Sequence, residues 1–222
     1  MRGLKTLLLA AAFSGAACQT WAWAEPAKAA PRPLASSAIA SAGASQDALR
    51  VERWIRARAD NHGLPYAIVD KKAARIYVMR PDGTLAGASN AILGSARGDT
   101  PIPGAGKKNP NALLPIERRT PSGRFLSKPG ANLAGEKVVW VDYDTGIALH
   151  RVRPGRTQAT RDMSLAKSPD DRRLSLGCVV APESFYLSTV LPALGHGRAV
   201  IYILPEDGPV EAMLAHPEPA RT

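Results

Sequence analysis

The chain has 222 residues, a formal net charge of +10 and a hydrophobic content of 45%. This length is ample for one domain with a substantial hydrophobic core. A basic balance can indicate nucleic-acid binding, but aromatic residues make up 5% of the chain and do not alternate with basic ones. We therefore expect no nucleic-acid partner, because a single-strand binding surface needs aromatic side chains on which bases can stack.

The first 24 residues have the order of a secretory signal peptide. Arg2 and Lys5 precede an apolar run at 7–17, and the small-residue cleavage site A-W-A follows at 22–24. The apolar run is too short to span a bilayer. We therefore expect a periplasmic protein whose mature chain has no membrane span. Loss of Arg2 and Lys5 lowers the net charge from +10 to +8. This positive charge either keeps the protein soluble or favours an anionic partner, which would be an extracellular polymer or a membrane surface.

The cysteines limit the covalent chemistry of the mature chain. Cleavage after Ala24 removes Cys18 and leaves Cys178 as the single cysteine, so we expect no intrachain disulfide. In the alternative, a lipoprotein modified at Cys18, Gly15 would stand where a leucine is expected. Under either interpretation Cys178 is unpaired, and it forms an intermolecular bridge, lies buried and inert, or is a reactive thiol.

The folded domain is expected to begin after a linker. Residues 25–46 are mostly Ala, Pro and Ser, a composition that cannot bury enough surface to fold. A helix is predicted over 47–62, with Gly63 as its C-cap, because helix formers and apolar residues end at that glycine. The domain is expected to extend over 47–205 and to be followed by a loose C-terminal tail at 206–222.

Short β-branched and aromatic runs after the helix predict strands. The Asp82-Gly83 pair, between Met79 and Leu85, indicates a hairpin turn between the second and third strands. The segment 94–119, rich in Gly, Pro, Lys and Arg, is too long for a plain connection and predicts a loop beside a site. The polar, basic segment 151–174 predicts a long excursion, and a helix is predicted at 181–195. The predicted strands are 66–70, 75–79, 85–93, 137–144, 146–150 and 198–205.

His150 is the candidate base of the chain. It ends a predicted strand, so its imidazole is expected at the edge of a buried sheet, where burial and neighbouring groups can tune its pKa. The alternative is a histidine that only packs at a strand end. For His62 at a helix end, His196 in a turn and His216 in the tail, we expect a capping or exposed role.

Cys178 is the candidate nucleophile, in the sequence LSLGCVV at 174–180. A thiol becomes a good nucleophile when a nearby imidazole takes its proton or holds the thiolate as an ion pair. Gly177 allows a close backbone approach, and backbone N–H groups at such a turn can receive an oxyanion. Ser175 can hydrogen-bond a histidine or a backbone group. The alternative is a buried strand with an inert cysteine.

Four ordered landmarks in the sequence resemble the catalytic domain of the L,D-transpeptidases, which are bacterial cell-wall enzymes. The resemblance covers about 66–205, most of the mature chain. Three features differ from the common pattern of the family. Arg151 stands where a glycine usually follows the histidine, and Val180 stands where an Arg or Asn usually lies two residues after the cysteine. The spacing of 28 positions between His150 and Cys178 is longer than usual. The landmarks are IVDKKAARIYVM at 68–79, TPSGRF at 120–125, ALH at 148–150 and SLGCVV at 175–180.

The resemblance implies a mainly β fold, sandwich-like or barrel-like, with short flanking helices. It implies that Cys178 is the nucleophile, within a Ser-x-Gly-Cys motif that includes Ser175 and Gly177, and that His150 is the base. The substrates would be peptidoglycan stem peptides, joined by 3-3 cross-links through a thioester enzyme intermediate. Thr120 begins a Thr-Pro-x-Gly-x-Phe element that would help to shape the sheet.

Arg172 and Arg173, directly before the motif, are candidate binders of stem carboxylates because a guanidinium group matches a carboxylate in a bidentate fork. The alternative is a solvated basic loop. No cofactor is expected and no metal site, because the sequence lacks H-E-x-x-H, a cysteine pair and a close histidine pair, and no glycine-rich phosphate loop is present.

Three other functions remain open on the sequence. The same site with water as acceptor would make an L,D-carboxypeptidase or another hydrolase. A sortase-like enzyme also uses Cys and His, but it needs an arginine on a strand after the cysteine, and Arg198 is the nearest candidate. A basic cell-wall-binding module with a relic site would not be an enzyme.

Overall fold

The structure is a computed structural model, and it describes residues 37–155 and 157–215. The predicted signal peptide, Cys18 and most of the predicted linker lie outside the described residues, as does His216. None of the described helices is long and apolar enough to cross a membrane.

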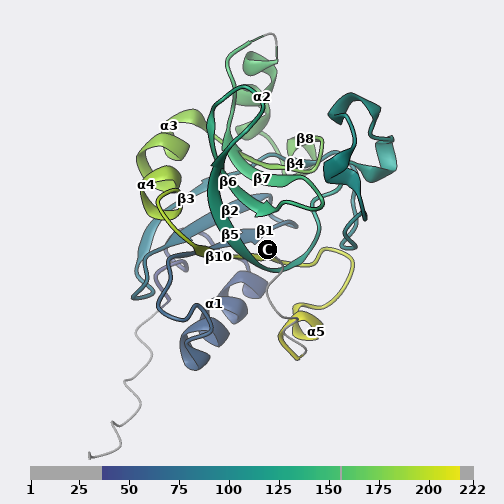
Figure 1. The fold of residues 1–222 in the computed structure, drawn as a ribbon. Coiled ribbons are helices and arrows are strands. Elements are labelled where there is room, and N and C mark those ends of the chain that lie inside the picture. The colour runs from purple at the N-terminus through teal and green to yellow at the C-terminus, as the bar shows by residue number, and fades with distance from the viewer. Residues whose placement is uncertain (1–36, 156, 216–222) are drawn as a thin grey trace, which may run out of the picture. The chain divides into compact units, whose positions relative to one another are not determined.

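The described residues form one large mixed sheet and a small second one, with short helices around them (Figure 1). The large sheet has the strand order β3-β2-β1-β10-β5-β6-β7-β9, and the small one pairs β4 with β8. The fold class predicted from the sequence, mainly β with short flanking helices, is therefore confirmed. The strands are β1 (Tyr66–Asp70), β2 (Arg75–Met79), β3 (Leu85–Asn90), β4 (Leu93–Gly94), β5 (Gly123–Ala131), β6 (Lys137–Asp142), β7 (Ile147–Arg151), β8 (Arg173–Ser175), β9 (Val179–Ala181) and β10 (Ala199–Ile203).

Helices cover both faces of the central strands. Side chains alternate between the two faces of a strand, so β1 sends Ala67 and Val69 into one hydrophobic cluster and Tyr66 and Ile68 into another. The helical segment after β9 packs on the first cluster, and α1 (Gln46–Arg58) packs on the second. Burial on both faces explains why β1 and β10 are buried at every position.

The excursion predicted at 151–174 is a crossover connection. β7 and β9 pair in parallel, and parallel neighbours cannot be joined by a tight turn. The connection contains the helix α2 (Gln158–Leu165), which the sequence did not predict. Leu165 is 8% exposed and packs in a small cluster with Val180, and the Asn90 side-chain amide donates to the Leu165 carbonyl at 2.7 Å. These contacts hold the excursion against the sheet.

Helix α1 ends earlier than the sequence predicted. It stops at Arg58, and Ala59 adopts the left-handed conformation, with φ 50°. The next two residues bond to other parts of the chain instead of continuing the helix. Asp60 accepts from the Arg124 guanidinium at 2.7 Å, and the Asn61 amide donates to the carbonyls of Leu64 and Pro81. Gly63 therefore lies in a turn beyond the helix.

Two other predicted elements differ from the structure. The strand predicted at 85–93 divides into β3 and β4. The helix predicted at 181–195 consists of α3 (Glu183–Phe185), a π-helical segment (Tyr186–Val190) and α4 (Leu191–Leu194). The wide π turns come directly before Pro192, which has no backbone N–H to continue the α-helical ladder.

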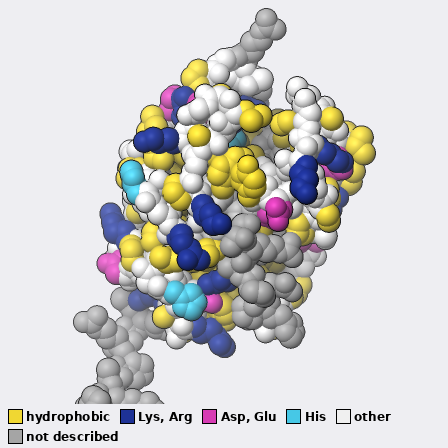
Figure 2. Space-filling model, in the orientation of Figure 1, with side chains coloured by type: hydrophobic (Ala, Val, Ile, Leu, Met, Phe, Trp, Pro, Cys, Tyr) yellow, Lys and Arg dark blue, Asp and Glu magenta, His cyan; other side chains and the backbone are white. Residues whose placement is uncertain are grey.

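The predicted C-terminal tail is partly packed on the domain. The side chain of Glu206 is 2% exposed and ion-paired, and α5 (Val210–Ala215) places Val210 in the same cluster as α1. Charged groups do not gather in one place on the face drawn in Figure 2, where Lys and Arg side chains lie scattered among hydrophobic and uncharged ones.

Candidate active site

The pairing of β7 with β9 brings His150 and Cys178 to the same face of the sheet. Leu149 lies opposite Val179, and both belong to the hydrophobic core. Because side chains alternate along a strand, the flanking residues His150 and Cys178 point to the other face. Both line a pocket of about 520 Å³. The two residues predicted from sequence to act together are therefore brought to one pocket.

The walls of the pocket come from segments far apart in the chain. The loop predicted beside a site contributes residues from Ile102 to Arg119, and the β5–β6 hairpin contributes Leu133. Trp140 and Tyr143 add aromatic surface, with their rings in an edge-to-face contact at 5.1 Å between centroids. These walls offer apolar surface around a thiol and an imidazole, as small-molecule and peptide sites commonly do.

The imidazole of His150 is oriented by the backbone. Its Nδ1 atom lies 2.8 Å from the Arg151 carbonyl oxygen, and the ring is 9% exposed. A carbonyl can only accept, so Nδ1 carries the proton and Nε2 is left as an acceptor. Burial, reinforced by the charges of Arg153 and Arg161, lowers the pKa of His150 to about 4, although the Arg151 carbonyl and Glu136 act in the opposite direction. The imidazole of His150 is therefore neutral at pH 7.

The thiol of Cys178 is also neutral. Burial raises its pKa, and a backbone hydrogen bond at Ala148 and the charge of Arg153 oppose that rise without cancelling it. Its Sγ donates to the Gly146 carbonyl at 3.7 Å and packs beside the small cluster that includes Val180. A neutral thiol and a neutral imidazole that line one pocket suit proton transfer during nucleophilic attack better than a preformed ion pair.

Gly177 and Ser175 shape the turn that carries the thiol. Gly177 has a φ of 129°, and a Cβ there would meet Ile147 Cδ1 at 2.9 Å and the Arg119 carbonyl oxygen at 3.0 Å. The Ser175 hydroxyl donates to the Cys178 carbonyl at 2.6 Å and accepts from the Gly177 N–H at 3.1 Å. Ser175 thus bonds to backbone groups of the turn, and the Gly177 N–H is already used and does not serve as an oxyanion donor in this arrangement.

Thr120 supports this turn from a distant part of the chain. Its hydroxyl donates to the Gly177 carbonyl at 2.8 Å and accepts from the Gly94 N–H at 2.9 Å, and its side chain is buried. The Thr-Pro-x-Gly-x-Phe element therefore does more than begin β5. It fixes the backbone directly before Cys178, a contact between residues 57 positions apart.

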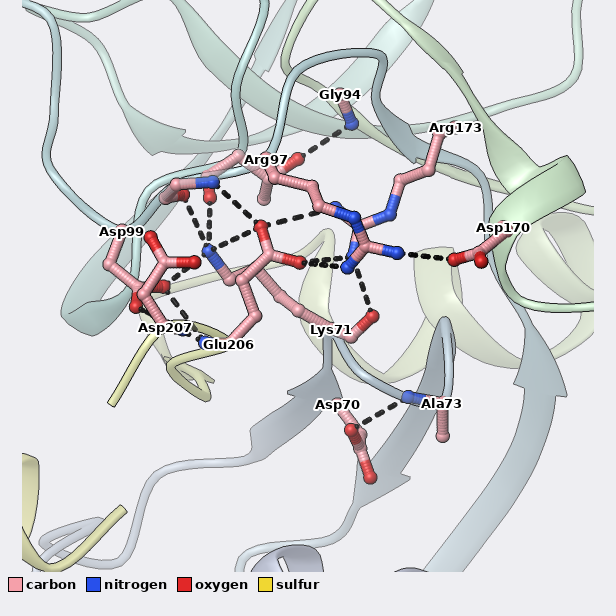
Figure 3. Close-up of polar contacts among 12 residues, drawn as sticks. Asp70, Lys71, Ala73, Gly94, Arg97, Asp99, Asp170, Arg173, Glu206 and Asp207 are labelled. Atoms are coloured by element: carbon pink, nitrogen blue, oxygen red, sulfur yellow. Dashed lines mark hydrogen bonds and ion pairs between the residues drawn. The ribbon is translucent and has the colours of Figure 1, made fainter. Parts of the chain in front are cut away.

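A buried ionic cluster centred on Lys71 contacts the backbone of Thr120. Figure 3 shows this cluster. The Nζ atom of Lys71, which is fully buried, donates to the carbonyls of Gly98 and Thr120, both at 2.8 Å, and lies 2.6 Å from a carboxylate oxygen of Asp99. Glu206 adds a second carboxylate at 3.5 Å. The cluster connects the end of β1, the loop before the pocket and the segment after β10.

Arg172 and Arg173 do not line the pocket, so their predicted role as carboxylate binders is not supported. The Arg172 side chain is buried and donates to backbone carbonyls, including that of Ala73 at 3.2 Å. Arg173 forms an ion pair with Glu206 and donates to the Lys71 carbonyl at 2.9 Å (Figure 3). Both guanidinium groups are thus committed to partners inside the domain.

Four cations line the pocket, and the sequence analysis singled out none of them. They are Lys108, Arg119, Arg153 and Arg161. The excursion after β7, which looked aperiodic, supplies two of them, and the loop before β5 supplies the others. His62 and His196 are exposed, as expected. In the part of the chain that the structure describes, no three His, Cys, Asp or Glu side chains form a group that could hold a metal ion.

Replacing Thr120 by valine is expected to lower the free energy of unfolding by about 1 to 3 kcal/mol, because it leaves the Gly177 carbonyl and the Gly94 N–H unpaired in a buried place. Thr120→Ser keeps the hydroxyl and is the matched control. Urea unfolding of the two variants checks this. Equal stability of the valine and serine variants would show that the hydroxyl contributes nothing to the turn.

Lys71→Met is expected to destabilise the domain by about 3 to 5 kcal/mol, because the change leaves buried carboxylates without their cation. Although burial acts in the opposite direction, the Gly98 N–H, Lys71 and Arg173 hold the pKa of Glu206 below its ordinary value. A carboxyl with a lowered pKa stabilises the fold above its unfolded pKa and loses that effect as the pH falls through the folded value. The stability gap between wild type and variant should therefore narrow on acidification below about pH 4, and a gap that stays constant contradicts the assignment.

Known proteins were compared with the chain in three ways. No protein-family model and no curated protein matches it. Among solved structures, it is similar to an L,D-transpeptidase from Enterococcus faecium, with 18% identity, a TM-score of 0.33 and coverage of 63% of this chain. It is similar to an L,D-transpeptidase from Mycobacterium smegmatis, with 16% identity, a TM-score of 0.36 and 63% coverage. It is also similar to the helical cell shape determining protein from Campylobacter jejuni, with 12% identity, a TM-score of 0.41 and 77% coverage.

The chain spans only part of the proteins in these structures: 49% of the Enterococcus faecium chain, 58% of the Mycobacterium smegmatis chain and 62% of the Campylobacter jejuni chain. Several of the solved structures to which it is similar are L,D-transpeptidases, the family that its motifs resemble.

Proposed function

We propose that the protein is an exported cysteine acyltransferase of the L,D-transpeptidase type, acting on peptidoglycan stem peptides. The observation that carries the proposal is the placement of Cys178 and His150 on one face of paired strands, in one pocket. The order of motifs in the sequence supports the same assignment, because it resembles this family over most of the mature chain. Export through the predicted signal peptide would bring the enzyme to its substrate in the periplasm.

The first half of the reaction forms a thioester. Nε2 of His150 takes the thiol proton as the sulfur of Cys178 attacks the carbonyl of the L-centre of diaminopimelate in a tetrapeptide stem. The C–N bond to the terminal D-alanine then breaks, and the imidazolium returns its proton to the leaving amine. The Nδ1 contact with the Arg151 carbonyl supports this role, because it presents the unprotonated Nε2 as an acceptor.

The second half resolves the thioester. An amine of a second stem attacks the acyl carbon, the C–S bond breaks, and the thiol is restored with the proton that the amine loses. His150 can again relay this proton. The product of this step is a 3-3 cross-link. If water is the acceptor, the same site releases a shortened stem as an L,D-carboxypeptidase.

Incubation of the purified protein with disaccharide tetrapeptide, followed by mass spectrometry of the products, tests the proposal. We expect cross-linked dimers and free D-alanine. Shortened monomers without dimers would support the hydrolase. Unchanged substrate, together with binding to isolated cell walls, would contradict an enzyme and support a cell-wall-binding module with a relic site.

A further inference from the structure

The cations of the pocket differ in how far they are neutralised. Lys108 forms an ion pair with Glu117, whereas Arg119 has no ion pair with the described residues and is held by a hydrogen bond from its Nε to the Ile116 carbonyl at 3.0 Å. Arg153 lies 3.0 Å from Glu136 through its Nε atom. Arg161 has no ion pair with any of the described residues. Its guanidinium group is therefore a cation of the pocket that the described residues neither pair with a carboxylate nor hydrogen-bond.

The charges around Arg153 nearly cancel one another. Glu136 is shared between Arg153 and Arg151, with the Arg151 contact at 2.6 Å, and Arg151 also pairs with Glu183. Two guanidinium groups and two carboxylates thus form one cluster at the edge of the pocket. Arg161 adds an uncompensated positive charge beside this cluster.

Both arginines line the pocket that also contains His150 and Cys178. Beyond the larger effect of burial, Arg153 and Arg161 each lower the pKa of His150, and Arg153 also acts on the thiol. The position of Arg161 is fixed by its helix, since Leu165, one turn later, is buried and its carbonyl accepts from Asn90. A ligand in this pocket therefore meets the positive charge of Arg161 in the same pocket as the sulfur.

We propose that Arg161, supported by Arg153, forms a carboxylate-binding subsite in the pocket of Cys178, and that the acyl donor is a peptide with a free carboxylate near the attacked carbonyl, in preference to its amidated form. A guanidinium group matches a carboxylate with two parallel hydrogen bonds. The subsite takes the role that the sequence suggested for Arg172 and Arg173. The peptide nature of the donor rests on the proposed function, whereas the preference for an anion beside the sulfur does not.

The test compares two alkylating reagents of almost the same size, anionic iodoacetate and neutral iodoacetamide, on the full chain at one fixed alkaline pH. Peptide mapping restricts the measurement to Cys178. A change in the ionisation of the thiol alters both rates equally, so the ratio of the iodoacetate rate to the iodoacetamide rate reports the local attraction of an anion. Arg161→Gln is expected to lower this ratio about three- to tenfold, and added salt should lower it in the wild type.

Two further variants complete the design. Arg161→Lys keeps the charge and should keep most of the ratio, which separates loss of charge from a disturbed helix. Arg198→Gln removes an exposed arginine that does not line the pocket and should leave the ratio unchanged. An unchanged ratio in Arg161→Gln, or an equal fall in Arg198→Gln, would overturn the subsite. Because alkylation needs no transpeptidase activity, this result stands apart from any failure of the proposed function.

Discussion

Cys178→Ala is expected to reduce product formation from disaccharide tetrapeptide to the background rate. The change removes the atom that forms the thioester, and no other cysteine is present among the described residues to replace it. The fold should survive, because the thiol packs beside only a small cluster at the edge of the pocket. We expect a loss of about 1 kcal/mol in the free energy of unfolding. The measurement is the rate of D-alanine release together with urea unfolding.

Cys178→Ser is the matched variant for this experiment. It keeps a hydroxyl of similar size in the same place, but the hydroxyl ionises far less readily than a thiol and should leave little activity. Undiminished dimer formation by a folded Cys178→Ala protein would show that Cys178 is not the nucleophile.

His150→Ala is expected to lower kcat/KM by about 100- to 10,000-fold, the usual contribution of a positioned general base. In the variant the neutral thiol keeps its proton, since burial raises the pKa of Cys178 and no imidazole is present to accept the proton. The packing of the hydrophobic core should be little disturbed, because His150 faces the pocket and Leu149, its neighbour on β7, faces the core. The measurement is kcat/KM for D-alanine release by the variant and by the wild type.

The pH profile of the wild type provides an independent check on this pair. Burial lowers the pKa of His150 to about 4, so the imidazole stays neutral down to that pH, and kcat/KM should fall only as the pH drops through about 4. Because the thiol pKa is raised, alkylation by iodoacetamide should increase only above the ordinary pKa of a cysteine. A plateau of rapid alkylation through the neutral range would indicate a thiolate–imidazolium ion pair and contradict the neutral pair.

The features that sequence reasoning predicted well depend on local signals. The strands β1 and β2 match the predicted 66–70 and 75–79, because short β-branched and aromatic runs are a local signal for strands. The Asp82-Gly83 turn is a local signal too, and it joins β2 to β3. His150 at the end of β7 also has a local signal. That it acts with Cys178 could be predicted because this is the single thiol of the mature chain, and the order of motifs supported the prediction. The strand pairing of β7 with β9 could not be predicted, since it crosses a long connection.

The features that sequence reasoning missed depend on partners far along the chain. Arg173 looked free to bind a substrate, yet its partner Glu206 lies 33 residues later, in a segment expected to be a loose tail. Thr120 and Gly177 meet over 57 residues. Arg161 lies on a helix of eight residues, too short for its periodicity to stand out in a polar stretch. Only the assembled sheet identifies which of the many arginines line the pocket.

The most direct test of the central claim is the intact mass of the protein during turnover. The protein is mixed with disaccharide tetrapeptide in the absence of an amine acceptor and quenched in acid within the first turnover. We predict an adduct with the mass of the disaccharide tripeptide acyl group, attached to Cys178 in the peptide map and absent from the His150→Ala protein at the same time point. Release of D-alanine without any adduct on Cys178, or no reaction with a folded protein, would contradict an acyl-enzyme at this sulfur.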